Sequence, residues 1–408
     1  MTGITKDELR KFTGLLRENS SDQYINIEPL QVGGILPPES RKTLLSFADG
    51  YSMCDFCLSG RLDEIEKPAV GEFLRLYSRF VDMDAAMPTA ASREAKKIII
   101  QQLATRVPEG IKPVLVIDGL AHYSTFMAAE FGGAEVLEVP HDGNPTFKVQ
   151  AEKYAAIIDA VKDNRNKQVI AALLTHADYL YGNVTPPEVV GKICKKKGVP
   201  FIVNGAYTVG IMPFSGKAAM ADFVTASGHK SMASSGPIGM LACSNEYFDL
   251  MFPRSTIKGE WSGKSFNHKI TTLLGCPAVY GAPLATLMSS LEHVVERTRP
   301  ENWAAQVENA RSLAATLERI EGVTLLGDRP HEHTLMQFST PPFEEAAKDA
   351  PKKGFFLYNE LKARGIVGIF PGMVKAIKLN TFGLTRAQVD HVGKSFIDIA
   401  RKYGCSVD

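Results

Sequence analysis

Lys230 lies in a segment whose residue types can turn an ordinary amine into a reactive one. The segment 222–232, DFVTASGHKSM, passes from an apolar run into polar residues, and Ser227 and His229 flank the lysine. Hydroxyl and imidazole groups beside an amine can bind a phosphate. An amine that is desolvated near other cations has a lowered pKa and attacks aldehydes. A lone lysine at a strand end is usually a solvated surface group, but these neighbours favour a cofactor anchor.

Polar residues also follow other apolar runs of the chain. His122, Asn183 and Asn204 each come at the end of such a run or shortly after it. Any one of them could be a turn or a cap, and Asn204 with the glycine after it reads as a plain turn. If the runs are parallel strands, their carboxyl ends meet at one edge of a sheet, where ligands bind. Together with Lys230 these residues therefore predict one site.

The elements that must position this site alternate between apolar strands and amphipathic helices. The apolar runs are Val114–Ile117, Val136–Val139, Val169–Leu174, Phe201–Val203 and Asp222–Ala226. The helical segments that separate several of them are 122–131, 151–163 and 186–197. This pattern predicts an α/β fold with a parallel sheet that helices cover on both faces.

A second, smaller unit is expected to follow the sheet. A long helical stretch at 284–320 leads to a region with strands near 322–326, 334–339 and 375–380 and helices near 353–364 and 385–402. A short amphipathic helix is expected at 5–19. We therefore predict an N-terminal segment (1–65), a large domain (66–283), and a helical connection with a small α+β C-terminal domain (284–408).

Composition restricts the partners of the chain. The net charge of +1 and the 45% of hydrophobic residues describe a globular enzyme without a broad cationic surface. Any contact with nucleic acid must then come from a local patch. Candidates are the run Lys195–Lys197 and the pair Lys352–Lys353, although such short runs are more often solvated helix faces. The charged N-terminus and the lack of an apolar span of ~18 residues predict a soluble, cytoplasmic protein.

The motif Cys54-x-x-Cys57 is a weak signal by itself. Zinc needs four ligands, and no second pair of cysteines or nearby pair of histidines completes such a set. The context does not clearly place the motif at a helix start after a strand, as in thioredoxin-like proteins. Two buried structural thiols are an equally good interpretation. Cys194, Cys243 and Cys405 match no motif.

These fragments together resemble a known family. The chain is similar to fold-type-I pyridoxal-phosphate enzymes of the aminotransferase class V and cysteine desulfurase group, and within it to the archaeal O-phosphoseryl-tRNA:cysteinyl-tRNA synthases. The matching fragments are IEPLQVGG (27–34), YSMCDFC (51–57), SREAK (92–96), VNGAY (203–207), SGHKSM (227–232), LGC (274–276) and KLNTFGL (378–384). They reach from residue 27 into the C-terminal domain, so the resemblance covers nearly the whole chain.

The resemblance implies roles for individual residues. Lys230 would hold pyridoxal 5'-phosphate as a Schiff base and shuttle the α-proton of the substrate. His122 would stack on the pyridine ring, Asn204 would approach the ring nitrogen, and Asn183 would hold the ring hydroxyl. The residues implied for the cofactor phosphate are Ser92, Arg93, Ser227 and His229. The helix that begins after Ser92 would add backbone N–H donors.

The resemblance also adds Cys276 as a third partner of Cys54 and Cys57. Three such thiols would carry sulfur as a persulfide or bind an iron–sulfur cluster, and both alternatives stay open. The implied reaction is the β-replacement of phosphate by sulfur on phosphoserine esterified to tRNA(Cys). Two alternatives are a cysteine desulfurase or lyase that acts on a free amino acid, and a non-catalytic tRNA-binding protein that kept the fold.

The implied reaction needs cations for two phosphates, and it also implies partners. Candidates for the substrate phosphate are Arg93, Arg254 and Lys375. The implied partners are tRNA(Cys) carrying phosphoserine, a sulfur donor, a second copy of the chain in a homodimer, and phosphoseryl-tRNA synthetase. The chain departs from the family pattern at Ala90-Ala91, at Tyr179-Leu180 and at Lys375, and it is longer around 259–263.

Overall fold

The computed structural model describes residues 7, 10, 23–30, 32–49, 70–273 and 281–408. Three predictions fall wholly or mostly outside these residues, namely the helix at 5–19, the Cys54-x-x-Cys57 motif and Cys276. The predicted division of the chain at residues 65/66 and 283/284 stays a prediction.

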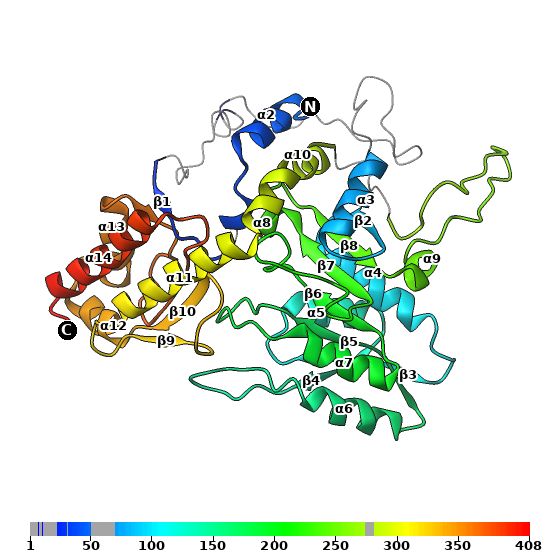
Figure 1. The fold of residues 1–408 in the computed structure, drawn as a ribbon, viewed down its shortest axis with the longest axis horizontal. Helices are drawn as coiled ribbons and strands as arrows, with labels where there is room; N and C mark the ends of the chain where they lie inside the picture. The colour runs from blue at the N-terminus through cyan, green and yellow to red at the C-terminus, as the bar shows by residue number, and fades with distance from the viewer. Residues whose placement is uncertain (1–6, 8–9, 11–22, 31, 50–69, 274–280) are drawn as a thin grey trace.

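A seven-stranded sheet forms the centre of the larger part of the molecule (Figure 1). Its strands are β2 (Ala85–Thr89), β3 (Lys112–Asp118), β4 (Glu135–Val139), β5 (Lys167–Thr175), β6 (Phe201–Asn204), β7 (Phe223–Ser227) and β8 (Gly239–Cys243). Their order is β2-β8-β7-β6-β5-β3-β4, and neighbours from β7 to β4 are parallel. The predicted α/β fold is thereby confirmed.

The sheet is nevertheless mixed, which the prediction of a parallel sheet missed. Strand β8 runs antiparallel to both of its neighbours, β7 and β2. Only residues 228–238 connect β7 to β8. A parallel neighbour would need a crossover connection of about a dozen residues or more, usually with a helix. The short connection therefore returns the chain in the opposite direction and leaves the turn that carries Lys230 at the edge of the sheet.

Helices cover this sheet and share its hydrophobic core. They are α3 (Val70–Phe80), α4 (Ser92–Ala104), α5 (Tyr123–Phe131), α6 (Lys153–Lys162) and α7 (Pro187–Lys197). Smaller elements around them are α8 (Gly228–Ser231), η2 (Asn245–Tyr247) and α9 (Phe248–Met251). The core extends from Val70 to Val294, and the side chains of Val114 to Ile117 in β3 are fully buried. Burial on both faces explains why the central strands are apolar runs.

The predicted helical stretch at 284–320 is two helices, α10 (Gly281–Arg297) and α11 (Pro300–Leu317). They lead from the large sheet to the smaller unit (Figure 1). Proline has no N–H to donate and disfavours helical backbone in the residue before it. Arg299 accordingly has φ −61° and ψ 142°, an extended conformation that caps α11. Pro300 is thus the physical reason for the break.

The smaller unit surrounds an antiparallel sheet with the order β12-β10-β9. Its elements are β9 (Thr324–Leu326), β10 (Leu335–Ser339), α12 (Pro341–Asp349), η3 (Lys353–Phe355), α13 (Phe356–Ala363), β11 (Ile366–Val367), β12 (Ala376–Asn380) and α14 (Arg386–Lys402). Strand β11 pairs with β1 (Ile25–Asn26), which precedes η1 (Val32–Gly34) and α2 (Pro38–Ser46). This unit has its own core, which includes Ile27 from the N-terminal segment.

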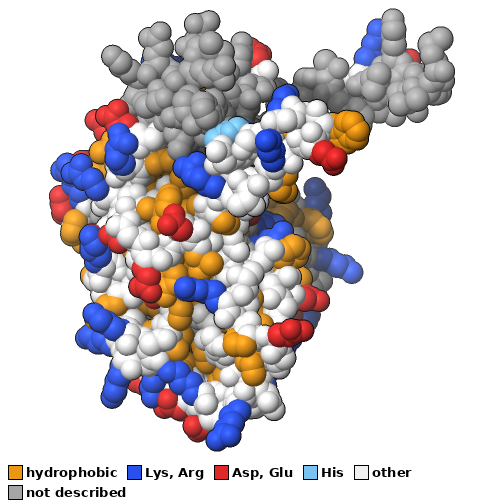
Figure 2. Space-filling model, turned by 90° about the vertical axis from the view of Figure 1, so that its right-hand side faces the viewer, with side chains coloured by type: hydrophobic (Ala, Val, Ile, Leu, Met, Phe, Trp, Pro, Cys, Tyr) orange, Lys and Arg blue, Asp and Glu red, His pale blue; other side chains and the backbone are white. Residues whose placement is uncertain are grey.

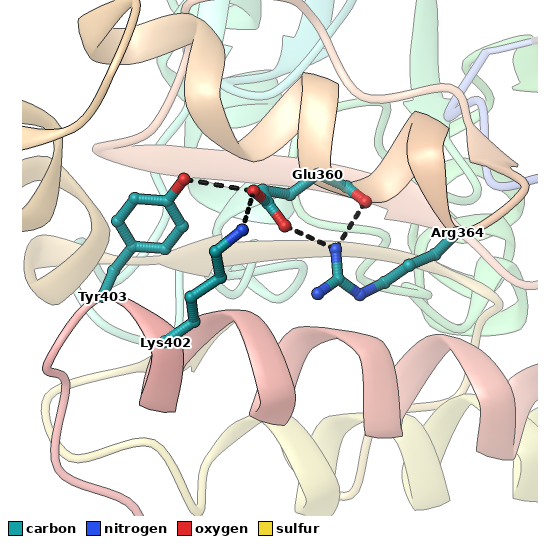
Figure 3. A network of polar contacts seen from close by, with 4 residues as sticks. All are labelled: Glu360, Arg364, Lys402 and Tyr403. Atoms are coloured by element: carbon teal, nitrogen blue, oxygen red, sulfur yellow. Dashed lines mark hydrogen bonds and ion pairs between the residues drawn. The ribbon is translucent and has the colours of Figure 1, made fainter.

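A polar network joins α13 to α14 on the outside of this core (Figure 3). The carboxylate of Glu360 accepts hydrogen bonds from Arg364 at 2.6 Å, Lys402 at 2.5 Å and the Tyr403 hydroxyl at 3.1 Å. These three donors lower the pKa of Glu360 although partial burial acts in the opposite direction. The network links the last helix, α14, to α13.

Charges of both signs are interspersed over the described part of the face in Figure 2, as the balanced composition predicts. Among the described residues, no helix has the length and apolar character needed to cross a membrane.

Candidate active site

A pocket lies where strands β5, β6 and β7 end, at the edge of the sheet that the sequence predicts. The pocket is partly open to solvent and is lined by a few convergent polar groups, as small-molecule sites usually are. The predicted site residues that line it are Ser92, Arg93, His122, Asn204, Ser227, His229 and Lys230. These residues come from the carboxyl ends of four different strands or from the connections that follow them, so the sheet brings them together.

Lys230 lies in the single helical turn α8, which directly follows β7. Burial is the main cause that lowers the pKa of its amine, and the nearby Arg93 guanidinium lowers it further. Its Nζ lies 5.0 Å from the centre of the Tyr207 ring. The amine is therefore closer to its neutral, nucleophilic form than a surface lysine is.

Two other segments of the chain contact the turn that carries Lys230 and support it. Gly33 and Gly34 of η1 pack so tightly against it that a Cβ on Gly34 would lie 1.9 Å from the His229 carbonyl oxygen. Arg297 of α10 donates to the carbonyls of Gly33, Gly210 and Ser231 at 2.6–2.9 Å. The position of the lysine is thus set by residues far away in the sequence.

His122 caps the N-terminus of α5 and lines the pocket. Its Nδ1 accepts the backbone N–H of Ser124 at 3.2 Å. Burial and the charges of Lys96, Lys230 and Arg93, in that order, lower its pKa to about 4. The ring is therefore neutral near pH 7 and can stack on a flat aromatic ligand.

The carboxamide of Asn204 lies at the end of β6, where it is almost fully buried. Its Oδ1 accepts the backbone N–H of Ala206 at 3.4 Å. Asn204 pairs in register with Thr175 of β5 and Thr225 of β7, so it lies between the ends of these two neighbouring strands. Its side chain can offer an amide, not a carboxylate, to a ligand on this side.

The N-terminus of α4 forms the anion-binding side of the pocket. The first helical turn contains Ser92 and Arg93, and Ala91 before it offers no capping side chain. Gly239 of β8 permits this approach, since a Cβ there would lie 2.4 Å from the Ser92 nitrogen. Free backbone N–H groups at a helix start bind phosphates. At this departure from the family pattern, the Glu94 carboxylate accepts the N–H of Ala90, which precedes the N-cap, so the first turn of α4 keeps its N–H groups free of a capping side chain.

The donors of this pocket fit pyridoxal phosphate. The positive charge of Arg93 lowers the pKa of Lys96, Lys230 and His122, in each case in addition to the larger effect of burial. Such an accumulation of positive charge calls for an anion, and a phosphate beside the N-terminus of α4 would neutralise it. The neutral ring of His122 and the amine of Lys230 supply a stacking surface and an aldehyde-reactive group in the same pocket.

Several residues of this pocket were not predicted from the sequence. They are Lys96, Ser124, Thr175, Tyr179, Ala206 and Tyr207. A signal existed for Lys96, because a spacing of three residues places it on the same helix face as Arg93. The others belong to matched or nearby fragments, but their types did not by themselves indicate a site.

Some predicted residues are not part of this pocket. The side-chain amide of Asn183 donates to the carbonyls of Thr146 and Phe147, and its Oδ1 accepts the N–H of Asp328 at 2.7 Å. It lines a different hollow between the two parts of the molecule. Arg254 and Lys375 are exposed and do not line the pocket. Of the three candidates for the substrate phosphate, the pocket contains Arg93 alone.

The cysteines that the structure describes do not form a site. Cys194 and Cys243 are buried, and burial raises the pKa of each thiol to about 12. Cys405 is partly exposed. Within the described ranges no group of three His, Cys, Asp or Glu side chains could hold a metal ion. Cys54, Cys57 and Cys276 lie outside those ranges, so this finding does not concern them.

Comparisons with known proteins agree with this geometry. Residues 104–407 match the family model described as O-phosphoseryl-tRNA(Sec) selenium transferase, SepSecS. The chain is 47% identical over 400 residues to the O-phospho-L-seryl-tRNA:Cys-tRNA synthase 2 of Archaeoglobus fulgidus, covering 98% of this chain and 100% of the relative. A relative from Methanopyrus kandleri, O-phospho-L-seryl-tRNA:Cys-tRNA synthase, is 46% identical over 98% of this chain and 99% of its own.

Solved structures show the same relationship. A complex of SepCysS with the SepCysE N-terminal domain aligns with a TM-score of 0.85 at 40% identity, covering 97% of this chain and 99% of that chain. The cysteine desulfurase CsdA of Escherichia coli aligns with a TM-score of 0.71 at 14% identity, covering 94% of this chain and 96% of its own. At that identity the second likeness shows a shared fold alone.

Proposed function

The chain belongs to the O-phosphoseryl-tRNA:Cys-tRNA synthase family, and from that membership and the pocket we propose how its residues carry out the reaction. The enzyme converts O-phosphoseryl-tRNA(Cys) to cysteinyl-tRNA(Cys) by replacing phosphate with sulfur. The family model carries a selenium-transferase description, but relatives 46–47% identical over nearly the whole chain are named for the cysteinyl product. The longer matches at high identity favour cysteine.

The observation that carries the proposal is the meeting of Lys230, His122, Asn204 and the N-terminus of α4 in one pocket. Pyridoxal phosphate, when bound there, supplies an electron sink that acidifies the α-hydrogen of the attached amino acid. We assign its phosphate to Ser92, Arg93, Ser227 and His229, and its ring to the space between His122 and Asn204.

Lys230 has two tasks in this proposal. Its Nζ bonds covalently to the cofactor and, when the substrate amine takes its place, accepts the α-proton. The lowered pKa of this amine suits both tasks, because only a neutral amine attacks an aldehyde or accepts a proton. Arg93 stands beside Nζ, where its guanidinium can also attract the phosphate of the substrate.

Asn204 favours elimination over amino-group transfer. A carboxylate at this place would stabilise a protonated ring nitrogen, whereas a neutral amide stabilises it less. The electron sink is then weaker, and a substrate with a good leaving group has the advantage. Phosphate leaves more readily than hydroxide, which gives a chemical reason for a phosphorylated serine.

The mouth of the pocket suits a substrate attached to RNA. A second hollow, open to solvent, shares Arg93 and His229 with the pocket and extends past Gly34 to α2. A free amino acid does not need such a space, whereas an amino acid esterified to a terminal nucleotide does. The hollow is compatible with a tRNA-linked substrate, and the names of the 46–47% identical relatives favour that substrate over the alternative of a desulfurase or lyase acting on a free amino acid.

We further propose that Cys54, Cys57 and Cys276 deliver the sulfur, as a persulfide or through an iron–sulfur cluster. We also propose that the enzyme is a cytoplasmic homodimer. The SepCysS relative forms a complex with SepCysE, and phosphoseryl-tRNA synthetase is a candidate partner of this chain. Light scattering of the purified protein tests the dimer. A Cys276→Ala variant that keeps its cofactor absorbance but loses activity with a sulfane-sulfur donor would support the role of the thiols.

Borohydride reduction followed by peptide mapping tests the cofactor anchor. We expect a pyridoxyl label on the peptide with Lys230 and none in a Lys230→Ala variant. A label on another lysine, or no label, would refute the assignment. Conversion of phosphoseryl-tRNA(Cys) with sulfide, compared with free phosphoserine and free cysteine, then tests the substrate, and turnover of the free amino acids alone would favour the desulfurase or lyase reading.

A further inference from the structure

Lys96 is a buried lysine to which the proposed reaction gives no task. Only 2% of its surface is exposed, and it lines the pocket beside His122 and Ser124. Its Nζ donates to Ser124 Oγ and Thr125 Oγ1, each at 2.9 Å. Both hydroxyls lie in the first turn of α5, where the helix dipole disfavours a cation. The burial of a lysine in so unfavourable a place indicates that it has a specific role there.

The contacts of Ser124 determine which nitrogen of His122 carries the proton. The backbone N–H of Ser124 points at Nδ1 from 3.2 Å, and its hydroxyl lies 2.9 Å from the same atom. A backbone N–H can only donate, so Nδ1 must present its lone pair. Lys96 donates to the Ser124 oxygen, which leaves the hydroxyl hydrogen free to point at Nδ1. The single proton of the imidazole is then on Nε2.

We propose that Lys96 is a positioning residue that acts through Ser124 to hold His122 as the neutral Nε2–H tautomer against the cofactor ring. The inference rests on the stacking role that the proposed function gives to His122. A neutral ring can stack on the cofactor without disfavouring the protonation of Lys230 any further. An imidazolium in the same place would add another positive charge to a pocket already rich in cations.

The charges around His122 support this assignment. Two hydrogen bonds of 2.9 Å through Ser124 place the Lys96 ammonium within about 6 Å of the imidazole. Burial, chiefly, and the charge of Lys230 lower the pKa of Lys96 to about 7. Below that pH Lys96 carries its positive charge. This charge opposes protonation of His122 in the pH range in which an imidazole ordinarily titrates. The other titratable groups near this pair are Arg93, Asp118, Tyr123, Tyr179 and Lys230.

Nitrogen-15 NMR of histidine-labelled, cofactor-free protein tests the proposal, with a His122→Phe variant to assign the signals. The wild-type His122 should show the Nε2–H tautomer and stay neutral down to about pH 5. Lys96→Met removes a like charge within about 6 Å, so the titration midpoint of His122 should rise by about one pH unit or more.

Two further variants separate the link from the charge. Ser124→Ala keeps the Lys96 charge and the backbone N–H donor but removes the bridging hydroxyl, so His122 should keep its proton on Nε2 while the Nδ1 signal moves toward that of a more weakly hydrogen-bonded, unprotonated nitrogen. Thr125→Val is the matched control, because it removes the other acceptor of Lys96 and should leave both His122 nitrogen signals unchanged. Thermal melting of each variant verifies that it is folded.

Three results would overturn the proposal. They are a wild-type His122 with its proton on Nδ1, an unchanged midpoint in Lys96→Met, and an effect of Thr125→Val equal to that of Ser124→Ala. All three are read without cofactor, substrate or turnover. Failure of the proposed reaction would appear in the borohydride and tRNA assays instead, so the two failures are distinguishable.

Discussion

Replacing Gly34 by alanine should displace the lysine that anchors the cofactor. The new Cβ would lie 1.9 Å from the His229 carbonyl oxygen, whereas real contacts of this kind are not shorter than 3.0 Å. The turn must therefore move by about 1.1 Å, and its position is braced by the hydrogen bonds from Arg297. Forcing an atom into such a space costs about 1–3 kcal/mol of stability.

The effect on the reaction should exceed the effect on stability. A misplacement of about 1 Å at a reacting group can lower a rate about 100-fold, so we expect a loss of that size in kcat with sulfide and phosphoseryl-tRNA(Cys). Urea unfolding measures the stability of the same variant. Gly198→Ala is the control, because Gly198 has φ +60°, with no atom within 4 Å of a Cβ. It should cost about 1 kcal/mol through backbone strain and leave the rate unchanged. A Gly34→Ala enzyme with the wild-type rate would refute this reasoning.

Three other variants test the supporting structure. Burial lowers the pKa of His333 to about 3 in the folded protein. In the unfolded chain the same imidazole has its ordinary pKa of about 6.5, so between these two pH values it binds a proton only when the chain is unfolded. Stability should fall as the pH drops from 6.5 toward 4, and His333→Gln should reduce that slope by up to about 1.4 kcal/mol per pH unit in urea titrations; an unchanged slope would contradict it. In Arg297→Lys, one ammonium cannot replace the guanidinium as the donor to all three carbonyls, so the free energy of unfolding should fall by about 2 kcal/mol or more. A loss under ~0.5 kcal/mol would show that these three hydrogen bonds contribute little to stability. Asn183→Ala should cost about 2 kcal/mol yet leave the cofactor absorbance unchanged, and a changed spectrum would mean that Asn183 touches the cofactor after all.

Much of the fold could be predicted because the central strands are buried on both faces. The runs that became β3, β5, β6 and β7 differ from the predicted bounds by at most two residues at either end. The direction of β8 could have been inferred from the short connection after β7, and the break between α10 and α11 from Pro300. Helix α12 was missed, although Pro341 and Pro342 open it at positions where proline is tolerated.

The sequence by itself determined where the chemistry lies. Lys230, Asn204 and Ser227 had to converge, because parallel strands deliver their carboxyl ends to one edge of a sheet, and the connections after them carry His122 and Arg93 to the same edge. This convergence follows from local patterns that can be read along the chain. The family fragments then assigned the kind of chemistry to these positions.

Only the tertiary structure decided how the side chains are supported and oriented. The burial of Lys96 depends on α4 and α5 meeting, and the fit of Gly34 depends on the N-terminal segment passing beneath a turn almost 200 residues away. Asn183 follows a strand as the other site residues do, yet Thr146, Phe147 and Asp328 engage its amide elsewhere. Such contacts join segments that are far apart in the sequence, so no pattern among neighbouring residues predicts them.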